Sequence, residues 1–187
     1  MTSRCFRTIF PPLRGSKIAA KLCVMPEEAH MDDQLATILR EQEPGEFLIA
    51  ALRLLFERDS YLLEVDANER SISHRLGLHL QFLLPDWDVD CEYNRDGVDP
   101  KRIGFLDLHP DDEDTEAKTV FPDIIIHQRG RNTNHLVIEI KKSSSMVNRE
   151  IDRQKLSGYK RDLHYEYALF IELEVGEQPG LATVEWV

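Results

Sequence analysis

The chain has 187 residues, of which 42% are hydrophobic and 30% are charged, and its formal net charge is −11. This length most simply forms one domain with a core that needs no disulfides, and its three cysteines, which lack metal or disulfide spacing, fit a reducing cytoplasm. No apolar run reaches membrane-span length, no signal-peptide core is present, and the acidic balance argues mildly against nucleic acid as a partner.

Residues 1–45 are expected to form an N-terminal extension that is partly irregular. Its first part, residues 1–30, is basic, is interrupted by prolines and shows no hydrophobic period. Three interpretations stay open for this part: a disordered or loosely attached extension, an overlong start, since Met25 and Met31 could also begin the chain, and a targeting peptide. Asp32–Glu41 is a short helical candidate that ends before Pro44-Gly45.

The remainder, residues 46–187, is expected to be one α/β domain with its core at 67–175. Phe47–Arg58 has one apolar face and predicts an amphipathic helix that packs on the core. A second helix is predicted from Asn68 to Leu83, with Asp66 or Asn68 as its cap.

Glu69 heads the apolar stripe of that second helix, because it lies three residues before Ile72. One interpretation is that Glu69 only complements the helix dipole in the first turn. Its position on the face that should be buried favours the other interpretation, a role in a site.

Three strands follow. Trp87–Tyr93 alternates apolar and acidic residues, as a half-exposed strand does. Asn94–Lys118 is a polar, acid-rich loop, which we interpret as a solvated insertion. Phe121–His127 and Leu136–Lys141 are short β-branched runs on either side of a turn-forming segment, residues 129–134, and predict a β-hairpin.

Both hairpin strands carry charge where a buried strand should carry none. Strand side chains alternate faces, so Leu136, Ile138 and Ile140 should point one way and Val137, Glu139 and Lys141 the other. The hairpin can bring Asp123 to the second face. Charge in a half-buried place is costly unless it is paired or metal-bound, so this conflict predicts a functional site.

A helix is predicted from Val147 to Leu163, then a buried strand at Tyr167–Val175 and an edge strand at Ala182–Val187. The order from Asn68 is therefore helix, three strands, helix, strand, with one more strand at the end. Bases concentrate in residues 141–161, which offsets part of the objection that the overall acidity raises against a phosphate ligand.

Pro122-Asp123 followed by Glu139-Ile140-Lys141 resembles the signature of the PD-(D/E)XK nuclease superfamily, the restriction-endonuclease-like phosphodiesterases. The segment from Asn68 to Val175 reproduces the element order of that family. The resemblance implies a mixed β-sheet flanked by helices, with an αβββαβ core and, here, an N-terminal helical extension.

The resemblance also implies site roles. Asp123 and Glu139 would bind Mg²⁺ or Mn²⁺, the Ile140 carbonyl would add a backbone ligand, and Glu69 would reach a second ion or a metal-bound water. Lys141 would orient or help to deprotonate the attacking water. Such hard ions prefer oxygen ligands, and a cluster of like charges would repel itself without a cation.

Four further residues are candidates for nucleic-acid contact: Lys142, Arg153, Gln154 and Lys155. The basic ones could contact phosphates, or they could simply form a solvated helix face. Gln154 resembles a polar residue that some family members carry on this helix. Its spacing to Tyr159 is one residue longer than the Gln-x-x-x-Tyr of one branch, so we interpret Tyr159 as a packing residue.

The resemblance favours a cytoplasmic, Mg²⁺-dependent nuclease acting on DNA, preferably an endodeoxyribonuclease. Cutting both strands with one site per chain would suggest a homodimer. Two alternatives stay open: a non-catalytic nucleic-acid- or partner-binding module on the same fold, and an α/β domain in which Glu139 and Lys141 form only a cross-strand salt bridge. Strand preference, target sequence and pathway are not indicated by the sequence.

Overall fold

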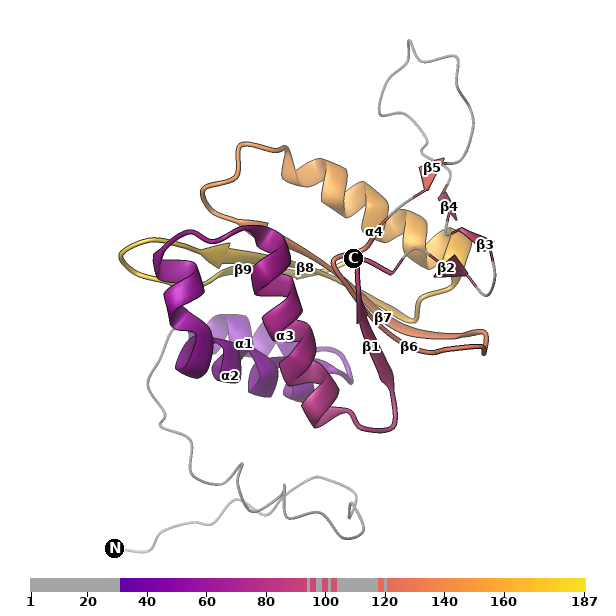
Figure 1. The fold of residues 1–187 in the computed structure, drawn as a ribbon, viewed down its shortest axis with the longest axis horizontal. Helices are drawn as coiled ribbons and strands as arrows, with labels where there is room; N and C mark the ends of the chain where they lie inside the picture. Colours follow the sequence, from indigo (N-terminus) through magenta and orange to yellow (C-terminus); the bar gives the residue numbers. More distant parts are fainter. Residues whose placement is uncertain (1–30, 94, 97–98, 101, 104–117, 120) are drawn as a thin grey trace, which may run out of the picture.

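A computed structural model describes residues 31–93, 95–96, 99–100, 102–103, 118–119 and 121–187. Within these ranges the chain is mixed α/β, with four helices, a five-stranded mixed sheet and two short two-stranded ladders (Figure 1). The helices are α1 (Asp33–Leu39), α2 (Gly45–Glu64), α3 (Glu69–Leu83) and α4 (Arg149–Leu163). The sheet strands are β1 (Asp88–Cys91), β6 (Ile124–Gln128), β7 (Thr133–Lys142), β8 (Tyr167–Glu174) and β9 (Gly180–Trp186).

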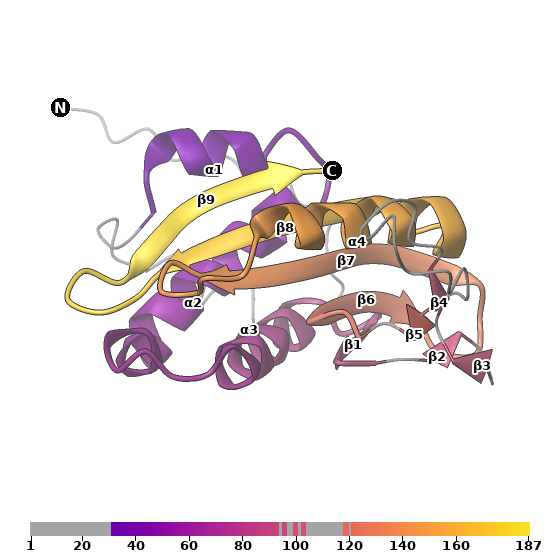
Figure 2. The same ribbon diagram turned by 90° about the horizontal axis from the view of Figure 1, so that it is seen from above.

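The strand order in the sheet is β1-β6-β7-β8-β9, and β7 is its central strand. The pair β7 and β8 is parallel, whereas the other neighbours are antiparallel. A parallel pair needs a crossover connection, and α4 supplies it. As predicted, β9 lies at an edge of the sheet, and Figure 2 shows it beside α1.

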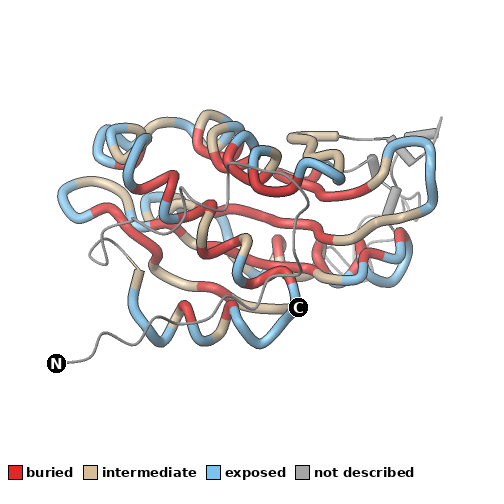
Figure 3. The backbone as a smooth tube through the Cα atoms, turned by 90° about the horizontal axis from the view of Figure 1, so that it is seen from below, coloured by how far each residue is buried: buried red, intermediate tan, exposed pale blue. Residues whose placement is uncertain are grey.

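The sheet has an apolar core on each face. The larger core packs α1, α2 and α3 against Ile138 and Ile140 of β7 and their neighbours, and the smaller packs α4 against Val137. This division confirms the predicted alternation of side chains along β7. Figure 3 shows the resulting pattern, in which the central strands are buried along most of their length and the outer helix turns are exposed.

The second helix, α2, runs past the predicted end at Arg58 to Glu64, with a break in helical geometry at Asp59 (φ −125°, ψ 16°). At this break Asp59 accepts a hydrogen bond from Arg75 and pairs with the buried His79, both at 2.7 Å. These two contacts outweigh burial and hold the pKa of Asp59 below its usual value. The helix therefore bends where its carboxylate reaches two partners on α3.

One other predicted segment differs from expectation. The segment interpreted as a loop, residues 94–118, includes short strands that form two ladders: β2 (Arg95–Asp96) with β3 (Asp99–Pro100), and β4 (Arg102–Ile103) with β5 (Lys118–Thr119). The rest of that segment and residues 1–30 lie outside the described residues. Among the helices described, none has the length and apolar content to cross a membrane.

The helix α1, which falls inside the expected N-terminal extension, packs on the sheet. Leu39 is fully buried, and the Trp186 indole N–H of β9 donates to the Ile38 carbonyl at 2.9 Å. The chain then turns sharply into α2, and a Cβ on Gly45 would lie 2.0 Å from the Leu39 carbonyl oxygen. This close approach requires glycine at position 45.

Gly45→Ala is therefore expected to lower the free energy of unfolding by about 2 kcal/mol or more. Helix propensity alone would make the alanine variant more stable by roughly 1 kcal/mol. The contact with the Leu39 carbonyl therefore predicts the opposite change in the free energy of unfolding. Urea unfolding measures the change. The control is Glu57→Ala, an exposed position on the same helix, which should stay within about 0.5 kcal/mol of wild type. Equal stability of Gly45→Ala and wild type would contradict the contact.

Candidate functional site

The candidate site lies where β7 continues past the end of β6. Ile124, the first residue of β6, pairs with Ile138, so residues 139–142 of β7 have no strand partner on that side. At these positions carboxylate side chains, in place of a neighbouring strand, accept the backbone N–H groups of β7. Asp123 accepts the Ile140 N–H at 2.7 Å, and Glu69, at the start of α3, accepts the Lys142 N–H at 3.2 Å.

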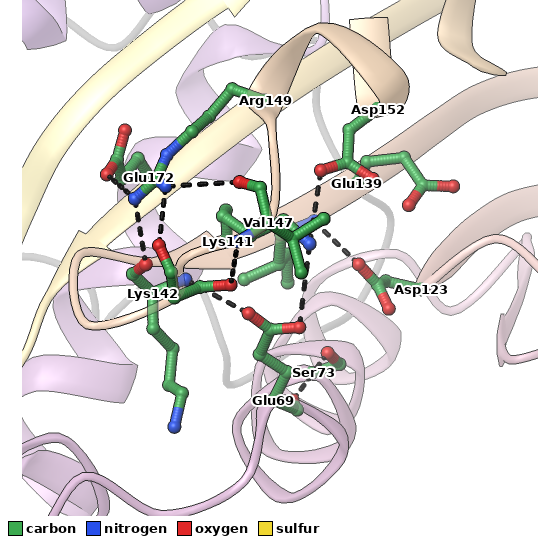
Figure 4. A network of polar contacts seen from close by, with 12 residues as sticks. Glu69, Ser73, Asp123, Glu139, Lys141, Lys142, Val147, Arg149, Asp152 and Glu172 are labelled. Atoms are coloured by element: carbon green, nitrogen blue, oxygen red, sulfur yellow. Dashed lines mark hydrogen bonds and ion pairs between the residues drawn. The ribbon is translucent and has the colours of Figure 1, made fainter. Parts of the chain in front are cut away.

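Lys141 lies at the centre of this end of β7 and is only 7% exposed. Its ammonium is 3.1 Å from Asp152 Oδ2 on α4 and 3.7 Å from Glu69 Oε2 on α3. Figure 4 shows the ammonium between these two carboxylates, with Asp123 close by. The amine that the sequence analysis singled out is therefore held from two sides by helices on opposite faces of the sheet.

Glu139 is also buried, at 3% exposed, and its two oxygens have different partners on α4. The Tyr159 hydroxyl donates to Oε1 at 3.1 Å, and the Lys155 ammonium donates to Oε2 at 3.4 Å. Lys155 also donates to Asp152 at 3.1 Å. Glu139 and Asp152 thus share one lysine.

The sequence analysis did not identify the polar role of two of these α4 residues. Asp152 was not selected at all. Tyr159 is a packing residue, as interpreted, and its hydroxyl in addition donates to Glu139. A signal was available in the spacing. Asp152, Lys155 and Tyr159 stand at i, i+3 and i+7, which places them on one helix face together with the buried Leu156.

The cluster carries more negative than positive charge. Its four carboxylates face two ammonium groups, which leaves an excess of two negative charges when all are ionised; the six residues are Glu69, Asp123, Glu139, Asp152, Lys141 and Lys155. Burial, and then the charge of Asp123, raises the pKa of Glu139 to about 8. Burial also raises the pKa of Asp123 to about 6, although the Ile140 N–H opposes this shift. The cluster therefore favours the uptake of positive charge.

Asp152 retains unused hydrogen-bonding capacity. It is 1% exposed, and its Oδ2 accepts no hydrogen bond from any described residue, because the Lys141 ammonium lies at ion-pair distance but outside hydrogen-bond geometry. A buried oxygen in this condition is costly, which makes it a natural acceptor for a water or for a reoriented lysine.

The donor chemistry fits a hard divalent cation. Asp123 and Glu139 offer carboxylate oxygens, and the Ile140 carbonyl faces the same open edge, because the N–H and C=O of a strand residue point to the same neighbour. Among the described residues, however, no three histidine, cysteine or acidic side chains converge into a complete metal-binding group. Lys155 supplies part of the compensating charge instead.

The four residues predicted to contact nucleic acid are placed differently from one another. Lys142 pairs with Asp66 at 2.7 Å, and Arg153 pairs with Glu185 at 2.8 Å while its guanidinium covers the Phe170 ring. Lys155 lies inside the cluster described above. Gln154 has a buried side-chain oxygen without a hydrogen-bond partner in the part of the chain that the structure describes. The three basic side chains therefore have acidic partners within the chain.

The fold and the site define this chain as a mixed α/β protein with a partly buried carboxylate–lysine cluster at the end of its central strand. No family model, no curated protein and no solved structure matches it.

The raised pKa values predict how stability depends on pH in EDTA. On unfolding, the pKa of Glu139 falls from about 8 to its ordinary value of 4.5, and the pKa of Asp123 falls from about 6 to 3.8. The folded protein therefore binds more protons than the unfolded chain between roughly pH 4 and pH 8, and these groups make the free energy of unfolding fall as pH rises through that range.

Glu139→Gln should raise the free energy of unfolding at pH 8 by about 1–3 kcal/mol and flatten its fall with pH. Glutamine still offers an oxygen to Tyr159 and Lys155. Urea unfolding across the pH range measures both effects, and Glu57→Gln, exposed on α2, is the control. A Glu139→Gln variant that is less stable than wild type at pH 8 would show that Glu139 is ionised and favourably paired.

Proposed function

We propose that this chain is a metal-dependent phosphodiesterase of the PD-(D/E)XK type that hydrolyses DNA on a restriction-endonuclease-like fold. One observation carries the proposal: the side chains of Asp123, Glu139 and Lys141 converge at one end of β7, in a buried cluster with an excess of negative charge. Among the described residues, Glu139 and Lys141 do not pair with each other: Lys155 pairs with Glu139, whereas Asp152 and Glu69 pair with Lys141, so the alternative of a simple salt bridge between them is not supported.

In the proposed enzyme, Asp123, Glu139 and the Ile140 carbonyl would hold the first ion, and Glu69 would serve a second ion or its water. The bound Mg²⁺ or Mn²⁺ supplies a Lewis acid for the phosphate and lowers the pKa of its water. Tyr159 fixes one oxygen of Glu139, which leaves the other directed toward Lys155. This arrangement sets the rotamer of Glu139 before any ligand arrives.

Lys141 is proposed to orient the attacking water and to stabilise, through its positive charge, the negative charge that develops on the phosphate. Asp152 and Glu69 hold its ammonium from two sides, at 3.1 and 3.7 Å. Asp152 is thus a positioning residue, because it acts through Lys141. The Lys141 ammonium could rotate toward hydrogen-bond geometry with Asp152 Oδ2 while it stays within ion-pair distance of that carboxylate.

The second candidate function is a non-catalytic module that binds nucleic acid or another partner. The observation that favours it is the position of Lys155, whose ammonium already bridges Glu139 and Asp152. If that lysine permanently replaces the ion, the fold keeps its charge balance without catalysis. Metal binding and cleavage therefore have to be measured separately.

Purified protein with Mg²⁺ or Mn²⁺ should nick supercoiled DNA or degrade a single-stranded circle, and EDTA should stop it. Glu139→Gln and Lys141→Met should each lower the rate by at least about a hundredfold, because Glu139 would hold the ion and Lys141 would position the attacking water. Lys160→Met is the matched control: it removes the same charge from an exposed position on α4 and should retain wild-type activity. Equal rates for wild type and Glu139→Gln would attribute the cleavage to a contaminant.

Mn²⁺ should raise the melting temperature of the wild type, since a ligand at a hundred times its Kd stabilises the fold by about 2.7 kcal/mol. Glu139→Gln should abolish the shift. Asp152→Asn should keep the shift but lose cleavage, because it loosens Lys141 and leaves the proposed metal ligands in place. A shift without cleavage in the wild type would support the module, and no shift would count against the metal site.

A further inference from the structure

A second candidate site lies at the other end of β7 and is not used by the proposed function. It is a cavity of about 380 Å³ between the start of α2, the end of α3 and the first residues of β7 and β8. Aromatic and acidic side chains dominate its lining; those used below are Phe47, Trp87, Tyr167, Glu43, Asp86, Glu166 and His135. Its volume is within the usual range for small-molecule sites.

A β-bulge builds this cavity. His127 pairs with Asn134 and Ile126 pairs with Leu136, so His135 is an extra residue on β7. Simple alternation from Val137 would turn His135 toward α4. The bulge turns it to the opposite face, where its ring stacks on Trp87 with centroids 4.6 Å apart and meets the edge of Tyr167 at 5.3 Å.

The carboxylates of the cavity surround this histidine. Glu166 lies 3.1 Å from His135 Nδ1, and Glu43 lies 3.5 Å from Nε2. Both carboxylates are about 60% exposed and pair with His135, so their negative charge lies at the solvent-facing side of the cavity. Glu166 and Glu43 also contribute to raising the pKa of the Tyr167 hydroxyl, behind burial. Among the described residues that line the cavity, none is lysine or arginine.

These features select the charge and the shape of a ligand. Three carboxylates and no lysine or arginine repel phosphates and nucleotides. Aromatic faces attract a cation that is large and weakly hydrated, because its desolvation costs less than that of a small metal ion. We propose that the cavity binds a small organic cation, an alkylammonium or a guanidinium, with Trp87 and Tyr167 as its walls and Glu43 and Glu166 as its counter-charges.

The proposal is independent of the nuclease hypothesis. The helix α3 begins at Glu69, in the carboxylate–lysine cluster, and ends at Leu83, in the cavity lining, so the two sites are separated by roughly 20 Å of helix. A variant in one site therefore leaves the residues of the other in place, and either proposal can fail alone.

The test follows the indole N–H resonances of the two tryptophans, Trp87 and Trp186, by NMR during a titration with choline chloride at constant ionic strength. The resonance that disappears in the variant Trp87→Phe belongs to Trp87, and the resonance that remains belongs to Trp186. The Trp87 signal should shift and saturate with choline. The uncharged carbon isostere of choline, dimethylbutanol, should move it little, because it lacks the charge that the aromatic faces and carboxylates recognise.

The double variant Glu43→Gln, Glu166→Gln should bind choline at least about fivefold more weakly. Glu177→Gln, exposed in the turn after β8 and remote from Tyr167, is the matched control and should bind as wild type does. Dispersed spectra of each variant verify the fold. No saturable shift with choline, an equal response to the neutral isostere, or unchanged affinity in the double variant would each overturn the proposal.

Discussion

The burial of excess negative charge at the end of β7 is the constraint on which the rest of the site depends. Carboxylates are expensive to bury unless each oxygen finds a donor or a cation. Here the donors come from three different sources: the free backbone edge of β7, the lysines at positions 141 and 155, and the Tyr159 hydroxyl. Removing any one of them leaves a buried oxygen without a partner.

This constraint explains the lengths and positions of the elements. The strand β6 has to begin only at Ile124. The Asp123 side chain can then accept the Ile140 N–H, which the backbone carbonyl of a longer β6 would otherwise accept. The N-terminus of α3 has to approach the same edge, so that Glu69 reaches the Lys142 N–H. The helix α4 has to cross over β7 with its acidic and aromatic face inward. The helix α4 lies over β7 because it connects the parallel strands β7 and β8.

The sequence predicted the parts of this arrangement that follow from local periodicity. The hairpin, the two faces of β7 and the edge position of β9 all depend on alternation and turn residues, and the structure confirms them. The charged positions of β7 could also be selected, because a charge in an apolar run violates the same rule.

The remaining features depend on tertiary contacts that no local pattern specifies. The break at Asp59 forms because two α3 side chains lie within reach, and the sequence around it reads as ordinary helix. The bulge at His135 changes the face of one side chain without changing the apolar pattern. Asp152 was missed because an acid on a polar helix looks solvated until the buried face of that helix is known.

The net negative charge of the chain does not by itself argue against a nucleic-acid substrate under the proposed function. Part of the negative charge is concentrated in the cluster, where the unloaded protein would repel a phosphate, and the basic side chains nearby are already paired with acids. Under the proposed function, a divalent ion compensates the excess of two negative charges in the cluster and removes that repulsion. Affinity for the ion and affinity for the phosphate backbone are then coupled by the same charges, and each must strengthen the other. Under that proposal, an acidic protein would act on an acidic polymer, because the cation that would activate the water would also make the site accessible to the substrate.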